Sequence, residues 1–145
     1  IPLRNVETAV KLLNCYRVDH GYTIVDNPQL MQYCKDTDMI FTVVPTNSYY
    51  MRTLEPERWA FDHPIRKMVE AGLRVHPNTD DPTMHHINAT EVWLLMYNFL
   101  GLSLENLRSF MINGIDGAWV DEATKQKWKA EWPAEFDKLA KDIKE

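Results

Sequence analysis

The sequence predicts an α/β fold in which a small parallel sheet is covered by helices. Short runs rich in β-branched and aromatic residues alternate with segments of helical periodicity, a pattern typical of parallel sheets. The clearest run, 39–44, is apolar without alternation, as expected for a strand that is covered on both faces. With 145 residues, 45% of them hydrophobic, the chain is long enough for one core, so a single domain is the default.

The first half of the chain alternates between the two kinds of element. The expected order is a helix over 3–13, a strand over 15–19, a helix over 28–35, a strand over 39–44, a long irregular connection over 46–61, a helix from Pro64 to Gly72 and a strand from Arg74. Pro28 and Pro64 each follow a capping residue and so occupy a first helical position.

Three further helices are expected in the second half. Asn88 with Glu91 forms a capping signal, Ser103 caps the next helix, and Asp121 opens the last one. Pro133 is expected to kink the last helix or to break it into two. Three strands cannot close a barrel of eight, so the sheet is either small and open or part of something larger.

Charge and cysteine content narrow the classes of function. The net charge is -5 and the lysines are interleaved with acids, which argues against a nucleic-acid partner. We expect no membrane span, because no apolar run reaches 18 residues. Cys15 and Cys34 lie in no metal-binding spacing and suit buried free thiols in a reducing, cytoplasmic location. The chain opens on Ile1 rather than Met, so a cut or an internal start is expected.

Chemically useful side chains follow directly after each expected strand. His20 follows the first strand, the corner 45–48 follows the second, and Asp80 with Asp81 follows the third. Because parallel strands end at one edge of a sheet, these groups should converge. A histidine, two carboxylates and polar loop groups at one edge indicate metal-assisted hydrolysis or general acid-base chemistry.

Plainer interpretations are kept open for the same residues. An Asp-Asp-Pro sequence is usually a turn or a helix start, and a histidine hydrogen-bonded at a strand end is an equal alternative for His20. His85 and His86 are adjacent, which is not a metal-binding spacing, so both are expected at the surface. His63 is expected to cap a helix, and His76 to face a helix layer or a barrel interior. A catalytic zinc takes three protein ligands, and only Asp80 and His20 are candidates here.

Four segments together resemble the carboxyl-terminal portion of the adenosine deaminase family. They are Arg17-Val-Asp-His-Gly-Tyr22, Pro45-Thr-Asn-Ser48, His63 to Gly72 and Asn78-Thr-Asp-Asp-Pro82, in the family's order and spacing. The resemblance extends through Leu107, Asn113 and Trp119. It implies a zinc-dependent (β/α)8 barrel that hydrolyses the 6-amino group of a purine.

The resemblance assigns a role to three residues. It implies that Asp80 is a Zn²⁺ ligand that also contacts the attacking water, that His20 polarises this water, and that Asp81, carrying a proton, bonds to purine N7. The small-molecule substrate is an adenine-type purine, with adenosine, adenine, a modified adenine or AMP all left open. No nucleic acid or membrane is implied as a partner.

The family's earlier histidine ligands and its catalytic glutamate have no counterpart in this sequence. Residues 1–145 are therefore expected to be a single incomplete domain, with strands six to eight of the barrel and its closing helices. We expect the full-length protein to be the deaminase and this fragment to be inactive. The alternative is a non-catalytic α/β module that self-associates or binds a partner through exposed strand edges and apolar helix faces.

Overall fold

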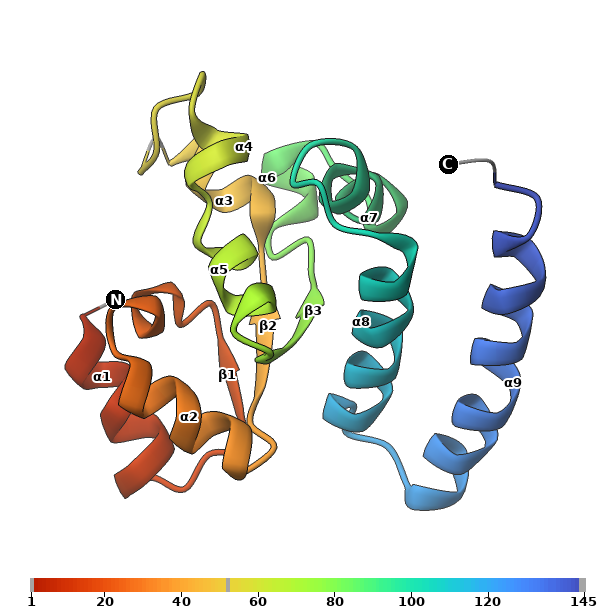
Figure 1. Ribbon diagram of the computed structural model, residues 1–145, viewed down its shortest axis with the longest axis horizontal. Coiled ribbons are helices and arrows are strands. Elements are labelled where there is room, and N and C mark those ends of the chain that lie inside the picture. The colour runs from red at the N-terminus through yellow and green to blue at the C-terminus, as the bar shows by residue number, and fades with distance from the viewer. Residues whose placement is uncertain (1, 52, 144–145) are drawn as a thin grey trace.

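A three-stranded parallel sheet lies at the centre of the chain. The computed structural model describes residues 2–51 and 53–143. The strands are β1 (Arg17–Asp19), β2 (Ile40–Val43) and β3 (Arg74–Pro77), hydrogen-bonded in the order β1-β2-β3 with β2 in the middle (Figure 1). Both strand pairs are parallel. The structure confirms the α/β class and the parallel sheet.

Helices connect the strands and complete the chain. They are α1 (Leu3–Glu7), the π-helix η1 (Thr8–Leu12), the 3₁₀-helix η2 (Tyr22–Asp26), α2 (Pro28–Asp36), α3 (Pro45–Tyr50), α4 (Trp59–Asp62), α5 (Pro64–Glu70), α6 (Pro82–His85), α7 (Ala89–Asn98), α8 (Leu104–Gly117) and α9 (Glu122–Ala140).

The predicted capping residues begin the helices for the expected reason. The side chains of Asn27, Asn88, Ser103 and Asp121 each accept a hydrogen bond from a backbone N–H of the first helical turn. Those N–H groups have no partner inside their own helix, so each cap satisfies a donor that the helix leaves free.

The main hydrophobic core lies on one face of the sheet. All four residues of β2 are buried, and Phe41 and Val43 belong to the same core cluster as Val75 of β3. Residues of α2 and α5, such as Cys34 and Met68, complete this cluster. The alternate residues point to the other face, as strand geometry requires. There Thr42 lies opposite His76, and their side chains are 3.2 Å apart.

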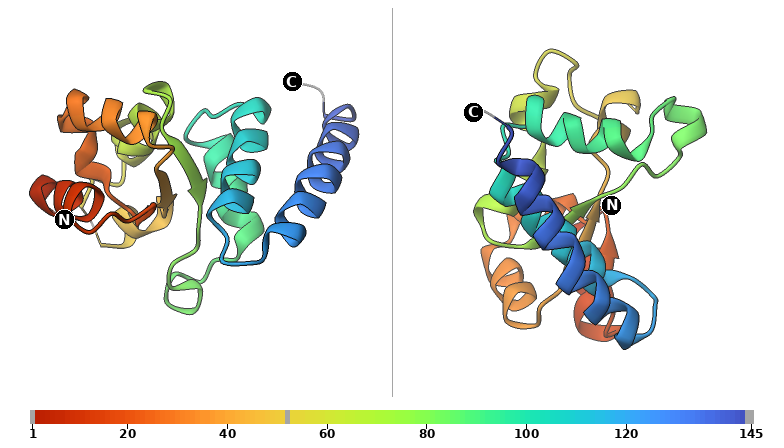
Figure 2. Two further views of the ribbon diagram at one scale, coloured as in Figure 1. Left: turned by 90° about the horizontal axis from the view of Figure 1, so that it is seen from below. Right: turned by 90° about the vertical axis from the view of Figure 1, so that its right-hand side faces the viewer.

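Helices α8 and α9 form the side of the molecule away from α1 and α2. Figures 1 and 2 both show α8 beside β3, with α9 beyond it. Asn113 of α8 donates from Nδ2 to the carbonyl oxygen of Val75 at 2.9 Å, which ties the helix to the third strand. Helix α9 has no fully buried residue in its described length, and Arg108 of α8 holds Asp137 of α9 through two hydrogen bonds.

One secondary-structure prediction is wrong, and one of two alternatives for another is excluded. The segment expected to be irregular contains α3 and α4, since Pro45 both ends β2 and opens α3, where its missing N–H costs nothing. Burial of Pro45, Thr46 and Ser48 then overrides the weak helix propensity of the segment. Of the two outcomes expected at Pro133, a kink or a break, the break does not occur, because α9 runs on through the proline and strong helix formers surround it.

Smaller differences concern the first helix and the cysteines. The predicted helix over 3–13 changes to π geometry after Glu7, with the N–H of Leu13 bonded to the carbonyl of Thr8. Cys34 is buried, as expected, and burial raises the pKa of its thiol to about 11. Cys15 is only partly buried, which differs from the prediction. No helix in the described residues combines the length and apolar character needed to cross a bilayer.

Truncating the centre of the core should destabilise the fold strongly. Phe41 lies on the middle strand and is fully buried, so Phe41→Ala is expected to cost about 3–5 kcal/mol of unfolding free energy. Phe61→Ala is the matched control, because that ring is 74% exposed and its loss should change stability by less than about 0.5 kcal/mol. Urea unfolding measures both, and equal midpoints for the two variants would contradict the described core.

Candidate functional site

The ends of the three strands meet, as the sequence predicts. His20 follows β1, Asn47 lies in α3 directly after β2, and Asp80 follows β3. Nε2 of His20 lies 3.5 Å from Oδ2 of Asp80, and Nδ2 of Asn47 donates to the same oxygen at 3.0 Å. The site is partly open, with 27% of the His20 side chain and 32% of the Asp80 side chain exposed. The expected convergence of these groups is confirmed.

The backbone holds Asp80 in an unusual conformation. Its φ is 59°, in the left-handed region that few residues other than glycine, asparagine and aspartate adopt readily. The side chain of Asn78 stabilises this turn, since its Oδ1 accepts from the N–H of Asp80 at 3.1 Å. The turn directs the Asp80 carboxylate towards β1 and α3, where His20 and Asn47 contact it.

Asp81 is placed differently from its neighbour. It precedes α6 as the N-cap residue, makes no capping bond with its side chain, and is exposed. Its carbonyl oxygen accepts from the N–H of His85 at 2.9 Å. The two adjacent carboxylates therefore have separate surroundings, and only Asp80 contacts His20.

A tight turn brings His20 to the edge of the sheet. His20 and Gly21 both have positive φ, 64° and 68°, and the N–H of His20 donates to the carbonyl of Thr42 at 2.8 Å. A Cβ at position 21 would lie 2.9 Å from Cε1 of Phe41, too close for any side chain. Glycine is needed at this position for two reasons, the left-handed backbone and the closeness of the core.

The other histidines lie outside this contact. His63 caps α5 as predicted, its Nδ1 accepting from the N–H of Ile65 at 3.2 Å. His76 faces Thr42 and Gly114 of α8, which is the helix-layer alternative.

His86 is exposed, but His85 is buried, and the prediction that both lie at the surface is wrong. The left-handed turn at His86 separates the rings of His85 and His86. The ring of His85 stacks on the ring of Tyr50, with 4.9 Å between the ring centres, and its Nδ1 lies 3.4 Å from Oγ1 of Thr46.

Burial of His63 makes the stability of the fold depend on pH. Burial lowers the pKa of His63 from 6.5 to about 4, so between these values the unfolded chain binds a proton that the folded chain does not. Unfolding free energy should fall as pH falls through this window, by about 3 kcal/mol from this residue. His63→Asn keeps a capping acceptor and removes the titration.

Unfolding of both proteins by denaturant from pH 7 to pH 4 measures this difference. Wild type should lose about 3 kcal/mol more than His63→Asn over that range. Because every other titrating group is common to both proteins, parallel pH profiles would show that His63 is protonated alike in the folded and unfolded chains.

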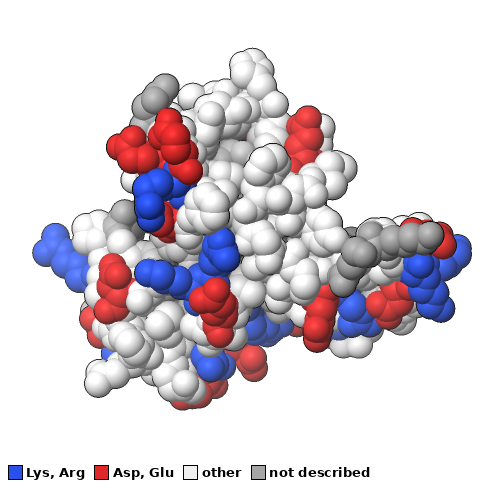
Figure 3. Space-filling model, turned by 45° about the horizontal axis from the view of Figure 1, so that its top comes forward, with Lys and Arg blue, Asp and Glu red and all other residues white. Residues whose placement is uncertain are grey.

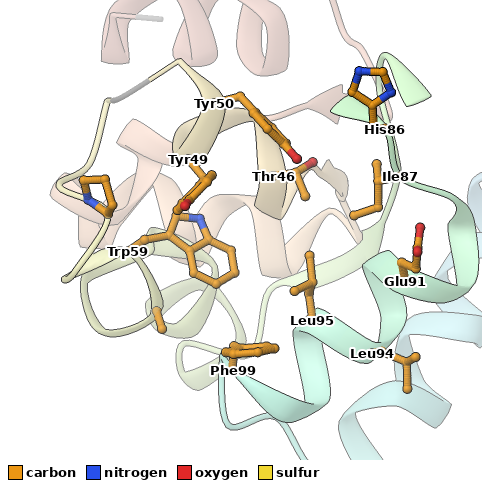
Figure 4. A pocket seen from close by; sticks show the side chains of 12 residues that line it. Thr46, Tyr49, Tyr50, Trp59, His86, Ile87, Glu91, Leu94, Leu95 and Phe99 are labelled. Carbon is orange, nitrogen blue, oxygen red and sulfur yellow. The ribbon is translucent and has the colours of Figure 1, made fainter. Parts of the chain in front are cut away.

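A pocket of about 580 Å³ lies between α3, α4 and α7 (Figure 4). Its walls are mainly aromatic and aliphatic, with Tyr50, Trp59, Leu95 and Phe99 among the residues that line it. Thr46 lines the pocket while the next residue, Asn47, contacts Asp80, so the two regions share helix α3. In Figure 3 a broad uncharged area occupies the centre of the face, and acidic and basic groups are intermingled around it without a basic stripe.

The donor groups fit a zinc site only in part. Within residues 2–51 and 53–143, no group of three or more His, Cys, Asp and Glu side chains is arranged to hold a metal ion. Asp80 and His20 supply a carboxylate and an imidazole at one point, the donor types that zinc prefers. A catalytic zinc needs three protein ligands, so further ligands would have to come from another segment.

Sequence reasoning missed two residues of this region. Asn47 lies in the corner 45–48 and Tyr22 in the segment 17–22, and the sequence pattern alone assigns a contact to neither. Asn47 bonds to Asp80, and Tyr22 packs its ring against His20. The position of Asn47 just after a predicted strand was the available signal for it.

Relatives of this chain are deaminases. An adenine deaminase from Acinetobacter baylyi is 30% identical over 127 residues, which make up 88% of this chain and 37% of that protein. An adenosine deaminase from Plasmodium falciparum is 28% identical over 126 residues, 86% of this chain and 33% of that protein.

Solved structures agree with this relationship. An amidohydrolase from Burkholderia ambifaria with bound zinc has a TM-score of 0.93 and 59% identity, over 97% of this chain and 39% of that one. An adenine deaminase from Arthrobacter aurescens has a TM-score of 0.84 at 24% identity and shows the shared fold, over 95% of this chain and 41% of that one. The chain thus spans less than half of the length of these relatives. The family model described as adenosine deaminase matches residues 1–131, and the chain therefore belongs to the adenosine deaminase family.

Proposed function

We propose that this chain is the carboxyl-terminal part of a zinc-dependent enzyme that hydrolytically deaminates an adenine-type purine. In this proposal β1, β2 and β3 are strands six to eight of a (β/α)8 barrel, α7 to α9 include its closing helices, and residues 1–145 form one incomplete domain. The observation that carries the proposal is the contact between His20 and Asp80, made at the carboxyl ends of parallel strands. Barrel enzymes place their chemistry at this edge.

Each site residue receives a role in the proposal. Asp80 is the zinc ligand from this segment and also contacts the attacking water, and Asn47 fixes the orientation of its carboxylate. Nε2 of His20, 3.5 Å from that carboxylate, lies where it can polarise the same water. Asp81, exposed beside Asp80, hydrogen-bonds purine N7 when it carries a proton. Zinc, when bound, lowers the pKa of water towards about 7 and so supplies the nucleophile near neutral pH.

The substrate is proposed at the level of an adenine-type purine. Relatives of the chain include an adenine deaminase and an adenosine deaminase, and an N6-methyl-AMP deaminase from Arabidopsis thaliana has the same fold at 15% identity and a TM-score of 0.74. The test uses the complete protein and measures release of ammonia from adenine, adenosine and AMP, and of methylamine from N6-methyladenine, with zinc content measured on the same sample. A zinc-loaded protein that releases no amine from any of these purines would contradict the proposal.

A self-associating module is the second candidate. Large apolar side chains are exposed, among them Leu12 at 78%, Leu13 at 68% and Trp119 at 78%, and the outer edges of β1 and β3 pair with no further strand in the described residues. Such surfaces favour association with another chain or with another segment. Size-exclusion mass measurement separates the candidates, since a monomer of 17.0 kDa that melts cooperatively would contradict self-association.

A further inference from the structure

Tyr22 joins the residues that follow two neighbouring strands. Its hydroxyl accepts from the N–H of Val44 at 2.7 Å and donates to the carbonyl of the same residue at 3.0 Å. Tyr22 lies two residues after His20, and Val44 directly precedes Pro45, where α3 begins. One side chain therefore fixes the segment that carries His20 to the start of the helix that carries Asn47.

The ring of Tyr22 contacts two imidazoles. It meets His20 edge-to-face at 5.7 Å and 77°, and His63 at 5.2 Å and 87°. His63 is fixed in turn by its bond to Ile65 and by an edge contact with Trp59 at 6.1 Å. Trp59 lines the pocket of Figure 4 and donates from Nε1 to the carbonyl of Pro45 at 2.8 Å. With its hydroxyl bonded to Val44 and its ring in contact with His63, Tyr22 has little freedom to turn.

His20 needs such support because its own backbone is strained. Its φ of 64° is unfavourable for a histidine, and such a conformation persists only when the surrounding structure holds it. The carboxylate of Asp80, which follows β3, contacts the imidazole of His20. The ring of Tyr22, two residues after His20 in the chain, contacts it as well. Burial raises the pKa of the Tyr22 phenol above its ordinary value, so the hydroxyl keeps its proton and continues to donate to Val44 at working pH.

We propose that Tyr22 is the positioning residue for His20, setting the imidazole against the Asp80 carboxylate by holding the ends of β1 and β2 together. The proposal rests on the proposed function, in which His20 polarises the attacking water. Tyr22 bonds to Val44 and packs on His20 rather than bonding to Asp80, so it acts through the position of His20 and of the start of α3. Replacing Tyr22 should therefore lower the catalytic rate more than it changes the metal content or the substrate affinity.

Three variants separate the ring from the hydroxyl. Tyr22→Phe removes the two hydrogen bonds to Val44 and keeps the aromatic ring, whereas Tyr22→Leu removes the hydrogen bonds and the ring. Tyr33→Phe is the matched control, because that tyrosine lies in α2 and its ring contacts Lys11 rather than the site. The first readout is the Cε1–H proton signal of each histidine in the 145-residue chain, with the His20 signal identified from its loss in His20→Gln.

The spectrum should change only at the rings that touch Tyr22. Tyr22→Leu is expected to move the His20 and His63 signals, Tyr22→Phe to move or broaden the His20 signal less, and Tyr33→Phe to leave both in place. An unchanged His20 signal in Tyr22→Phe and Tyr22→Leu would overturn the proposal. If Tyr22→Leu does not fold, Tyr22→Phe decides, because an unchanged His20 signal in that variant overturns it as well.

The second readout is kinetic and uses the complete protein. Tyr22→Leu should lower kcat by about tenfold to a hundredfold, since displacing a catalytic group by about 1 Å has effects of that size. KM should stay within roughly twofold and zinc content should not change, because the lost interaction acts on the transition state. A variant that only melts earlier, with wild-type kcat well below its melting temperature, would reduce Tyr22 to a structural residue and overturn the proposal.

The two readouts also distinguish failure of this inference from failure of the proposed function. If the wild-type protein deaminates no purine, the function is wrong, yet the histidine spectra still report whether Tyr22 sets the position of His20. If the wild-type protein is active and Tyr22→Leu is equally active, the function stands and the positioning role is wrong.

Discussion

Replacing Asp80 in the complete protein is expected to abolish zinc retention and purine deamination together. Asp80 is the candidate zinc ligand from this segment, and its Oδ2 also receives the contacts of His20 and Asn47. Removing an outer-shell partner of a metal ligand already costs about 10–100-fold in metal affinity, so losing the ligand itself should cost more than that. Zinc analysis of the purified protein and ammonia release measure the two losses.

The choice of substitution matters because Asp80 has a positive φ. Alanine at 59° strains the backbone, whereas asparagine tolerates this conformation and matches the shape of aspartate. Asp80→Asn therefore removes the negative charge with little strain. Asp80→Ala removes the charge and also strains the backbone. Normal zinc content in Asp80→Asn would contradict the role given to this carboxylate.

Asp81 supplies the control for the same experiment. Its side chain is exposed and separate from the His20 contact, so Asp81→Ala should spare zinc and lower kcat/KM. Asp81→Asn offers an N–H donor to purine N7 and should recover part of the loss. Loss of zinc in Asp81→Ala would mean that the two neighbouring carboxylates have been assigned the wrong way round.

The 145-residue chain on its own is expected neither to retain stoichiometric zinc nor to deaminate a purine. Its described residues bring together no set of three metal-binding side chains, and it spans 39% of the zinc-bound relative from Burkholderia ambifaria. With too few ligands, zinc should exchange readily with a chelator. Dialysis against a weak chelator, followed by zinc analysis and the ammonia assay, tests both parts, and one retained zinc per chain with turnover would contradict them.

The sequence was sufficient to place the candidate site because the geometry of a parallel sheet determines which strand ends lie together. Once three strands are assigned, their carboxyl ends must share an edge, and this brings His20 and Asp80 together from positions 60 residues apart. The capping residues were equally accessible, since Asn88 and Ser103 act on N–H groups only a few positions along the chain. Both kinds of prediction depend on local pattern or on a general rule of topology.

The residues that were missed depend on tertiary contacts. Nothing in the sequence next to His85 shows that Tyr50 will stack on it, and α3 forms from residues with weak helix propensity because the fold buries them. The role of Tyr22 is likewise invisible until Val44, 22 positions away, is placed beside its hydroxyl. Such contacts follow from packing, which a single sequence does not specify.

Asp116 of α8 links the sheet to the last helix, because Arg74 of β3 and Lys129 of α9 both pair with its carboxylate. Burial alone would raise the pKa of Asp116, but the hydrogen bonds from Lys129 and Arg74 outweigh it and leave the pKa below its usual value. Helix α9 has no fully buried side chain in its described length, and it is attached by the packing of Phe136 on the core and by charge, through this cluster and through the pair of Arg108 and Asp137. Dissolved salt screens such attachments but not the core around Phe41. The chain therefore combines a core insensitive to ionic strength with a terminal helix whose local opening free energy depends on it.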